Sequence, residues 1–399
     1  MSPNKLKRIA IICGYSFPDG LAPTNRILTY SKGLVELAVK VHIFIYFPTD
    51  SIEKNLPVNG SVNGINYHYP GTRSYPSNKF IRKLSHIFYC YKSIRVLIKE
   101  NRKEKFDLAI ISSDWFRILY AFIPALKIIG LKIVFIADEF PVPIRVYLKT
   151  SISFWRKLLF KNSLKFVSGM IFMTQSLKEF YNGIVKKNSF ILPSVVDISR
   201  FTDVRDTHEN KKHLCYMGNM ELSKDNVDNI IDAFYLIADK FIDIEFHLYG
   251  APSQIDKAKL IALIKKYNLE KRVLFKGKVN NNEVPVILKN SYILVSSQPD
   301  TKRAAGGFPT KLGEYMAVGV PTLLTAVGEI PNYITNGVNG WLAKPNDPQD
   351  YAVKLKYIIE NYPAALEVAD KAKKYVNDNF DYKFQCAKLL QFLNNIVNE

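Results

Sequence analysis

The stretch that decides the fold of this chain is GGFPTKLGEYMAVGVPTLLT, residues 306–325. It reads as a glycine-rich loop, a helix, a glycine stop and then a buried strand over residues 321–325, which is the order of elements in an α/β domain. Gly306, Gly307 and Pro309 predict an open, bent loop whose backbone N–H groups can approach a ligand closely. The helix that follows would direct its N-terminal N–H groups and the positive end of its dipole at the same ligand.

Lys311 and Glu314 lie three residues apart, on the same face of this predicted helix. Backbone donors, a cation and one carboxylate suit a ligand that carries phosphates and a vicinal diol, which describes a nucleotide-sugar. Glu314 would accept hydrogen bonds from both ribose hydroxyls. An ordinary loop–helix unit with a solvated Glu314 is the alternative, and the rest of the chain decides between the two interpretations.

Strands and helices alternate along the chain in two successive series. Short apolar runs at 7–13, 39–47, 108–112, 133–137 and 170–174 alternate with helical stretches, and after Asp197 the pattern restarts with runs at 214–217, 244–249, 273–276 and 292–296. This alternation predicts parallel sheets with crossover helices. The expected fold is α/β, with two doubly wound, Rossmann-like domains over residues 1–190 and 191–378 that face an active-site cleft.

Seven further segments follow one another in a characteristic order. They are residues 14–33, 192–201, 216–227, 246–250, 274–279, 328–331 and 336–342. With these segments, the chain resembles the retaining nucleotide-sugar glycosyltransferases of the GT-B fold, of the type of glycosyltransferase family four, over almost its whole length. The resemblance implies that the C-terminal helix, residues 379–399, crosses back onto the first domain.

Lys224 is the first predicted catalytic residue, because it follows Gly218 in a loop that opens a helix. A fixed cation there would stabilise the departing nucleoside diphosphate, although a lone lysine at such a position is also typical of an ordinary surface. The chain departs from the family pattern at Asn219, where an arginine is common, and at Gly306, where a glutamate is common. These departures leave the donor sugar open, and Lys311 is expected to supply the missing positive charge.

Further candidates come from both domains. Glu139 follows a buried strand at its carboxyl end, where α/β sites lie, and would orient the acceptor hydroxyl unless it is a surface loop residue. The segment from Gly20 to Arg26 would close over the diphosphate, with Arg26 as an acceptor or phosphate ligand or else a surface residue. The predicted catalytic residues are Lys224, Lys311 and Glu139. The predicted substrate-binding residues are Gly20, Arg26, Asn219, Gly250, Val279, Gly306, Gly307, Phe308, Pro309, Thr310 and Glu314.

The net charge of +19 lies almost entirely in the first half of the chain. Residues 1–190 carry 29 Lys and Arg against 11 Asp and Glu, a net charge of +18. Such a field indicates an anionic partner, which could be nucleic acid, an anionic membrane surface or a phosphorylated acceptor. Residues 78–105 and 145–166 mix apolar and aromatic positions at helical spacing with basic residues, as in a helix at a lipid interface. A solvated basic face over a packed core stripe is the alternative.

Other classes of function find little support in the sequence. No run approaches the ~20 apolar residues that span a bilayer, and we expect a cytoplasmic protein, peripheral on the inner face of the cell membrane. No cofactor and no metal site are predicted, because no phosphate-binding P-loop, no D-x-D at a strand end and no paired histidines occur. A nucleotide-sugar epimerase and a non-catalytic nucleotide-sugar-binding subunit remain alternatives. A nucleic-acid partner is not predicted, because only the charge favours it.

Overall fold

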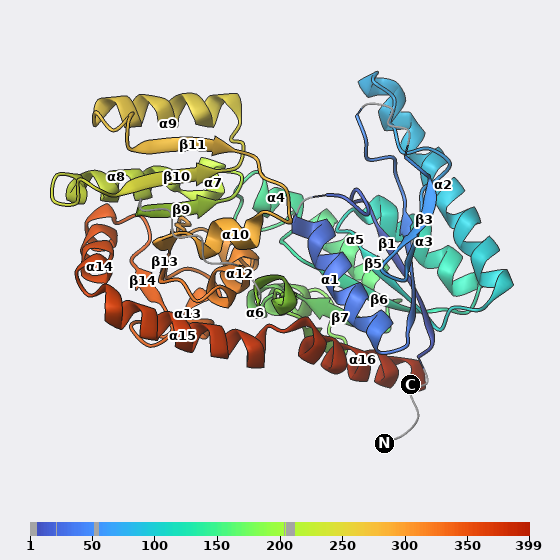
Figure 1. The fold of residues 1–399 in the computed structure, drawn as a ribbon. Coiled ribbons are helices and arrows are strands. Elements are labelled where there is room, and N and C mark those ends of the chain that lie inside the picture. Colours follow the sequence, from blue (N-terminus) through green and yellow to red (C-terminus); the bar gives the residue numbers. More distant parts are fainter. Residues whose placement is uncertain (1–5, 21, 52–55, 203, 205–211) are drawn as a thin grey trace. The chain divides into compact units, whose positions relative to one another are not determined.

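The computed structural model describes residues 6–20, 22–51, 56–202, 204 and 212–399. The chain divides into two compact units: unit 1 comprises Met1–Val195 and Tyr382–Glu399, and unit 2 comprises Val196–Asp381. The boundaries expected from the sequence, at 190/191 and 378/379, fall slightly earlier in the chain. Figure 1 shows unit 1 in blue to green with the last red helix, and unit 2 in green to orange-red.

Unit 1 is built on an eight-stranded sheet in the order β3-β4-β2-β1-β5-β6-β7-β8. Its strands are β1 (Arg8–Cys13), β2 (Lys40–Ile45), β3 (Asn59–Val62), β4 (Ile65–His68), β5 (Leu108–Ser112), β6 (Lys132–Ala137), β7 (Gly169–Phe172) and β8 (Ser189–Ile191). All neighbours pair in parallel except β3 and β4, which form an antiparallel hairpin. Every residue of β1 and β5 is buried, as expected for central strands covered on both faces.

The helices of unit 1 connect these strands. They are α1 (Ala22–Glu36), α2 (Lys79–Lys103), α3 (Phe116–Ile128), α4 (Val142–Arg145), α5 (Phe154–Leu164), α6 (Gln175–Asn182) and α16 (Tyr382–Asn398). From β1 the chain first builds outward to β4 and then returns to the other side of β1 with β5. The carboxyl ends of β1 and β5 therefore flank a topological switch point, where ligands of such sheets bind.

The C-terminal helix α16 packs against α1 within unit 1. The backbones approach so closely at Gly33 that a Cβ there would lie 2.5 Å from Sγ of Cys386. The Tyr382 hydroxyl donates to the carboxylate of Glu36 at 2.8 Å, and Leu389 and other apolar residues of α16 join the core of the sheet. The C-terminal segment of the chain is thus part of the N-terminal unit.

Unit 2 is built on a six-stranded, fully parallel sheet in the order β11-β10-β9-β12-β13-β14. Its strands are β9 (His213–Met217), β10 (Glu245–Tyr249), β11 (Val273–Gly277), β12 (Ile293–Val295), β13 (Thr322–Thr325) and β14 (Trp341–Ala343). Its helices are η1 (Ile198–Phe201), α7 (Leu222–Asp225), α8 (Val227–Ala238), α9 (Gln254–Lys266), α10 (Val284–Lys289), α11 (Lys302–Gly306), α12 (Lys311–Ala317), α13 (Ile330–Tyr333), α14 (Pro348–Glu360) and α15 (Tyr362–Asn379). The strand order reverses between β9 and β12, which places the switch point of unit 2 there.

The predicted fold class, two doubly wound parallel-sheet α/β domains, is confirmed. Two local expectations differ. The segment 145–166 is not one helix, because α4 and α5 are separated by residues 146–153. The β3–β4 hairpin was not anticipated, although Asn63 and Gly64 form its turn with positive φ angles of 52° and 77°. No helix in the described part of the chain has the length and apolar character needed to cross a bilayer.

Candidate active site

Lys311 is the first residue of α12, and its ammonium reaches back to the end of β9. It lies 3.3 Å from Oδ1 of Asp225, donates to the Tyr216 hydroxyl at 3.2 Å and sits 4.3 Å from the centroid of the Tyr216 ring. Burial lowers the pKa of Lys311, and the carboxylate of Asp225 opposes that shift. The cation is therefore held in place at the switch point by one carboxylate and one phenol.

Lys224 and Asp225 end the short helix α7, which directly follows the loop after β9. The sequence placed Lys224 in a loop, and this local expectation is wrong, because the backbone N–H of Lys224 already closes a turn onto the carbonyl of Glu221 at 2.8 Å. Burial opposes ionisation of Asp225, yet Lys311 and Lys224 hold the pKa of Asp225 below its usual range. Both lysines are thus close enough for their charges to act on one carboxylate.

Arg303 joins the same region from α11, which follows β12 across the switch point. Its Nη1 and Nη2 donate to the two carboxylate oxygens of Glu221 at 2.6 and 3.3 Å, and Arg303 lowers the pKa of Glu221. Such two-point pairing fixes both groups in direction as well as distance. Lys224, Lys311 and Arg303 therefore face the two carboxylates Glu221 and Asp225, which leaves a local excess of one positive charge.

Glu314 lies one turn into α12 and is held by Arg200 of η1. Nη1 of Arg200 donates to Oε1 of Glu314 at 3.0 Å, while its Nη2 donates to the carbonyl and side-chain oxygens of Asn281 at 2.8 and 2.9 Å. Burial raises the pKa of Glu314, and Arg200 opposes the shift. The Glu314 side chain is 29% exposed, so its carboxylate can still accept hydroxyl bonds.

The ends of β9, β10 and β11 bring Gly218, Gly250 and Val279 to one edge of the sheet. Gly250 has a φ of 130°, and a Cβ there would collide with the carbonyl oxygen of Gly218, so only glycine fits. The N–H of Gly218 donates to the carbonyl of Tyr249 at 2.9 Å. Asn219 is exposed and Val279 is half-buried. This edge can provide shape and backbone contacts for a flat ring such as a nucleobase.

The glycine-rich stretch differs from the open loop expected from its sequence. Gly306 is buried and ends α11, and neither Gly306 nor Gly307 has a positive φ. The Thr301 hydroxyl oxygen accepts from the N–H of Ala304 at 3.2 Å and so starts this short helix. Phe308 and Pro309 are buried, and the half-buried Thr310 precedes α12. The open loop therefore shortens to residues 307–310.

Arg26, on α1 in unit 1, is buried, with 4% of its surface exposed. It forms an ion pair with Asp138 and donates to the carbonyl of Leu192 at 2.7 Å. Burial raises the pKa of Asp138, and Arg26 opposes the shift. Both contacts hold the guanidinium of Arg26 in the interior of unit 1. The role of Arg26 as a substrate ligand stays a prediction.

Gly20 precedes α1 and is exposed, but it has no room for a side chain. A Cβ at Gly20 would collide with Oγ1 of Thr24, which donates to the carbonyl of Ser16 at 2.6 Å. Leu21, within the segment predicted to close over the diphosphate, lies outside the described residues. The role of Gly20 is not tested by these contacts.

Glu139, at the carboxyl end of β6, is linked through Arg145 to Asp114 at the end of β5. Nη1 of Arg145 donates to Oε2 of Glu139 at 2.8 Å, and its Nη2 lies 3.5 Å from Oδ1 of Asp114. Burial raises the pKa of Asp114, and Arg145 opposes the shift. The Glu139 side chain is 35% exposed, so it can meet a ligand while Arg145 fixes its direction.

Arg200, Arg303 and Asp225 in unit 2 were not predicted as site residues from the sequence. Arg200 lies 114 residues from its partner Glu314, and Arg303 lies 82 residues from Glu221. Sequence spacing gives no signal for pairs so distant. Asp225 directly follows Lys224, so it could have been predicted as the carboxylate that balances the charge of that lysine. Among the residues that the structure describes, no group of three or more His, Cys, Asp or Glu side chains could hold a metal ion.

Comparison with known proteins agrees with this architecture. Residues 198–375, which make up nearly all of unit 2, match the family model described as Glycosyl transferases group 1. Sucrose-phosphate synthase from Thermosynechococcus elongatus is similar over 98% of this chain and 99% of its own, with a TM-score of 0.78 and 15% identity. Anabaena HepE in complex with UDP and glucose is similar over 98% and 100%, with a TM-score of 0.73 and 16% identity.

These likenesses show that the whole chain has the GT-B fold, and that its second unit resembles that of a glycosyltransferase. The family that matches, over residues 198–375 alone, is that of the group 1 glycosyl transferases. In sequence, a putative colanic acid biosynthesis glycosyltransferase of Salmonella typhimurium is 33% identical over 138 residues, 33% of this chain and 34% of that relative. The first curated relatives are matched over only 34 to 51% of their own length.

Proposed function

We propose that this protein transfers a sugar from a nucleoside diphosphate to a hydroxyl group of a saccharide acceptor, with retention of the anomeric configuration and without a metal ion. The observation that carries the proposal is the charge cluster at the switch point of unit 2. There, Lys224 and Lys311 converge on Asp225 from two separate elements. A position at the carboxyl edge of a parallel sheet with a local positive excess suits a diphosphate.

The donor would lie along this edge with each part facing a suitable group. Lys311 and Lys224 would hold the diphosphate, and the carboxylate of Glu314, directed by Arg200, would accept from the ribose hydroxyls. Gly250 and Val279 would flank the base. Crystals of the structurally similar HepE contain UDP and glucose, which makes uridine nucleotides the first donors to test.

The chemistry would rest on charge stabilisation of the leaving group. The bond between the anomeric carbon and the β-phosphate oxygen breaks, and its electron pair stays on the diphosphate, whose growing charge the two lysines stabilise. The acceptor oxygen bonds to the anomeric carbon on the same face. Its proton passes to the departing phosphate oxygen, so atoms and charge balance without a further reactant.

The acceptor side is assigned to unit 1. Glu139, held by Arg145, is the proposed group that orients the acceptor hydroxyl. The relative named for colanic acid biosynthesis supports an envelope saccharide as the acceptor class. The net charge of +18 on residues 1–190 supports an acceptor presented at an anionic membrane surface.

The proposal is tested by measuring which nucleotide raises the melting temperature and whether sugar is then transferred. A ligand at about 100 times its dissociation constant adds about 2.7 kcal/mol to the stability, which is readily measured. The anomeric configuration of the product, read by proton NMR, tests retention. Absence of any nucleotide effect would overturn the donor site. Binding without transfer to any lipid-linked or free saccharide would favour the non-catalytic subunit, for which the missing side chain at Gly306 is the argument.

A further inference from the structure

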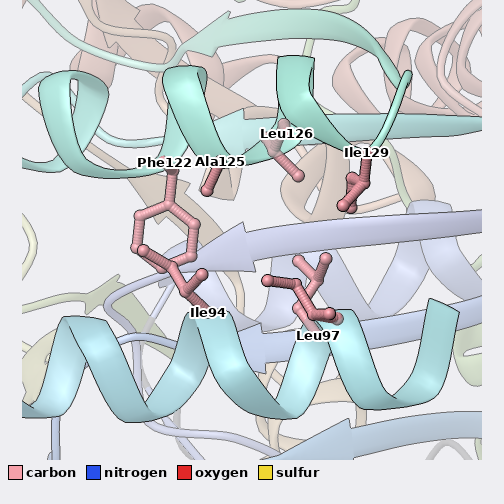
Figure 2. A pocket seen from close by; sticks show the side chains of 7 residues that line it. Ile94, Leu97, Phe122, Ala125, Leu126 and Ile129 are labelled. Carbon is pink, nitrogen blue, oxygen red and sulfur yellow. The ribbon is translucent and has the colours of Figure 1, made fainter. Parts of the chain in front are cut away.

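Helix α2 of unit 1 has two halves with opposite environments. In its C-terminal half, Ser93, Leu97 and Asn101 are buried. Figure 2 shows this half packed against α3, with Ile94 and Leu97 facing Phe122, Leu126 and their neighbours. The seam is lined only by apolar side chains and leaves no room for a water molecule. This half is ordinary core packing.

The N-terminal half of α2 carries a second apolar stripe that faces solvent. Its members are 52 to 80% exposed: Phe80, Ile81, Leu84, Ile87, Phe88 and Tyr91. Their spacing of three and four residues places them along one continuous face of the helix. Single exposed apolar residues are normal, but a contiguous exposed stripe of this kind marks an interaction surface.

A second exposed apolar group lies at the start of α5 and in the segment before it. Its members are 51 to 72% exposed: Val146, Tyr147, Leu148, Phe154 and Trp155. Both groups flank the N-terminus of α3. His86 of α2 stacks on Trp115 with ring centroids 5.7 Å apart, and the guanidinium of Arg156 lies 5.5 Å from the centroid of Phe116.

The exposed apolar residues lie near the proposed acceptor residues of unit 1. Helix α3 begins just after the carboxyl end of β5, where Asp114 lies beside Arg145. His86 also stacks on Phe47, at 3.8 Å, just beyond the carboxyl end of β2. The exposed stripe and the proposed acceptor residues therefore occupy the same edge of the sheet in unit 1.

The charged residues within the two sequence stretches that carry the apolar groups are all basic. Residues 79–99 contain six Lys and Arg and no Asp or Glu, and residues 146–165 contain five and none. Lys92 lies 4.5 Å from the ring centroid of Phe88 and Arg95 lies 5.8 Å from that of Tyr91, so cations border the stripe. A second copy of this surface would bring like charges together, and nucleic acid would not require the apolar side chains. An anionic lipid surface satisfies both features.

We propose that unit 1 docks on an anionic membrane by inserting the N-terminal half of α2, together with Trp155 and its apolar neighbours, into the interfacial region. The basic residues lie at the level of the lipid headgroups and the apolar stripe lies below them. The edge of unit 1 that carries Glu139 is then held at the membrane surface. The purpose of docking rests on the proposed membrane-borne acceptor, whereas docking itself does not depend on donor chemistry.

The partition test compares three variants of the full chain on vesicles of phosphatidylcholine, alone or mixed with phosphatidylglycerol. The apolar variant replaces Leu84, Ile87 and Phe88 with glutamine, and its matched control replaces Ile242, Ile255 and Val353, which are similarly exposed in unit 2. The charge variant replaces Arg82, Lys83, Arg156 and Lys157 with glutamine. All of these side chains lie outside the donor cluster.

We expect the apolar variant to lose at least about tenfold in partition onto mixed vesicles, the factor expected if lipid buries even one of the three side chains. The matched control should bind as the unchanged protein does. The charge variant should lose most of its preference for mixed vesicles over phosphatidylcholine alone. A blue shift of fluorescence on vesicle addition should be reduced in Trp155→Phe, which reports insertion of that ring.

Equal binding of the apolar variant and its matched control would overturn insertion. A concentration-dependent dimer that the apolar variant abolishes would overturn the lipid assignment in favour of a second copy. Nucleotide-induced melting shifts, measured on the same samples, separate the two proposals. Vesicle binding without any nucleotide effect would leave docking intact and remove the glycosyl-transfer function.

Discussion

The switch points of the two units carry opposite local charge, and neither charge follows from the net charge of its unit. In unit 2, whose part of the sequence is almost neutral, Lys224, Lys311 and Arg303 outnumber the carboxylates Glu221 and Asp225. A set with a positive excess at a sheet edge suits a diphosphate. The chemistry of this site therefore does not follow from the net charge of its unit.

Unit 1 has the strongly basic sequence, yet acids prevail at its sheet edge. Three carboxylates, Asp114, Asp138 and Glu139, face the two guanidinium groups of Arg26 and Arg145. Its basic residues lie instead on helices such as α2. The basic charge of unit 1 thus belongs to a surface, while its site offers acceptor groups for hydroxyls.

The two charged clusters also differ in how deeply they are buried. The largest expected effect comes from breaking the buried ion pair of unit 1. Arg26 is buried against Asp138, so Arg26→Met leaves an unpaired buried carboxylate, which costs about 3–5 kcal/mol. We expect a matching loss of unfolding free energy in urea. The double variant Arg26→Met/Asp138→Leu should recover much of that loss, because no buried charge remains. A single variant as stable as the parent would show that this pair is solvated.

The second prediction concerns the more exposed cluster of unit 2. Lys224→Ala removes one fixed donor to the leaving group, so turnover should fall on the order of 10²–10³-fold. Its urea midpoint should change little, because the side chain is only half-buried. Lys240→Ala, just beyond the C-terminal end of α8, is the control and should keep full turnover. Unchanged turnover in the Lys224 variant would remove this lysine from the mechanism.

The parts of the molecule that could be predicted from the sequence are those with a local sequence pattern. Most buried strands of both sheets were identified because they are short continuous apolar runs such as residues 9–13, whereas the three-residue strand β14 was not. Lys224 was named because it follows Gly218 in a loop expected to open a helix, and Lys311 and Glu314 because they share one face of the helix after the glycine-rich stretch. The short hairpin at Asn63 and Gly64 was missed, although this dipeptide is a known hairpin signal.

The partners of the site residues were not predictable in the same way. Arg200 and Arg303 reach their carboxylates only after α12 and α11 are packed, and sequence separation gives no indication of such contacts. Gly306 was read as loop because glycine disfavours helices. The Thr301 cap and the two alanines after Arg303 nevertheless start a short helix that extends to it.

The third prediction tests whether Glu314 accepts hydrogen bonds from the ribose hydroxyls of the donor. Glu314→Ala removes a pair of charge-assisted hydroxyl bonds, which costs about 1.5–3 kcal/mol. Affinity for the nucleoside diphosphate should therefore fall roughly 10- to 100-fold by calorimetry. In the unchanged protein, a 2′,3′-dideoxyribose nucleotide should bind correspondingly less well. Equal affinity for the two nucleotides would contradict the role of Glu314 whatever the variant does.

The smallest expected effect concerns pH and Lys311. Burial lowers the pKa of this lysine from 10.5, so in the free protein it loses its proton at a lower pH than an ordinary lysine does. Binding that requires the ammonium is complete below that pKa and weakens as pH rises through it, by at most about tenfold per pH unit. Nucleotide binding in the alkaline range should accordingly take up a proton, which calorimetry in buffers of different ionisation enthalpy measures.

Lys311→Arg provides the control for this pH dependence. A guanidinium keeps its charge throughout the alkaline range, so the variant should bind diphosphate with an affinity that no longer falls as pH rises. Titration of the nucleobase would affect both proteins alike and so drops out of the comparison. The same slope in both proteins would show that another group controls the pH dependence. Lys311 would then serve to position Asp225 and Tyr216 rather than to hold the diphosphate. Lys224 would remain as the cation that holds the diphosphate in unit 2.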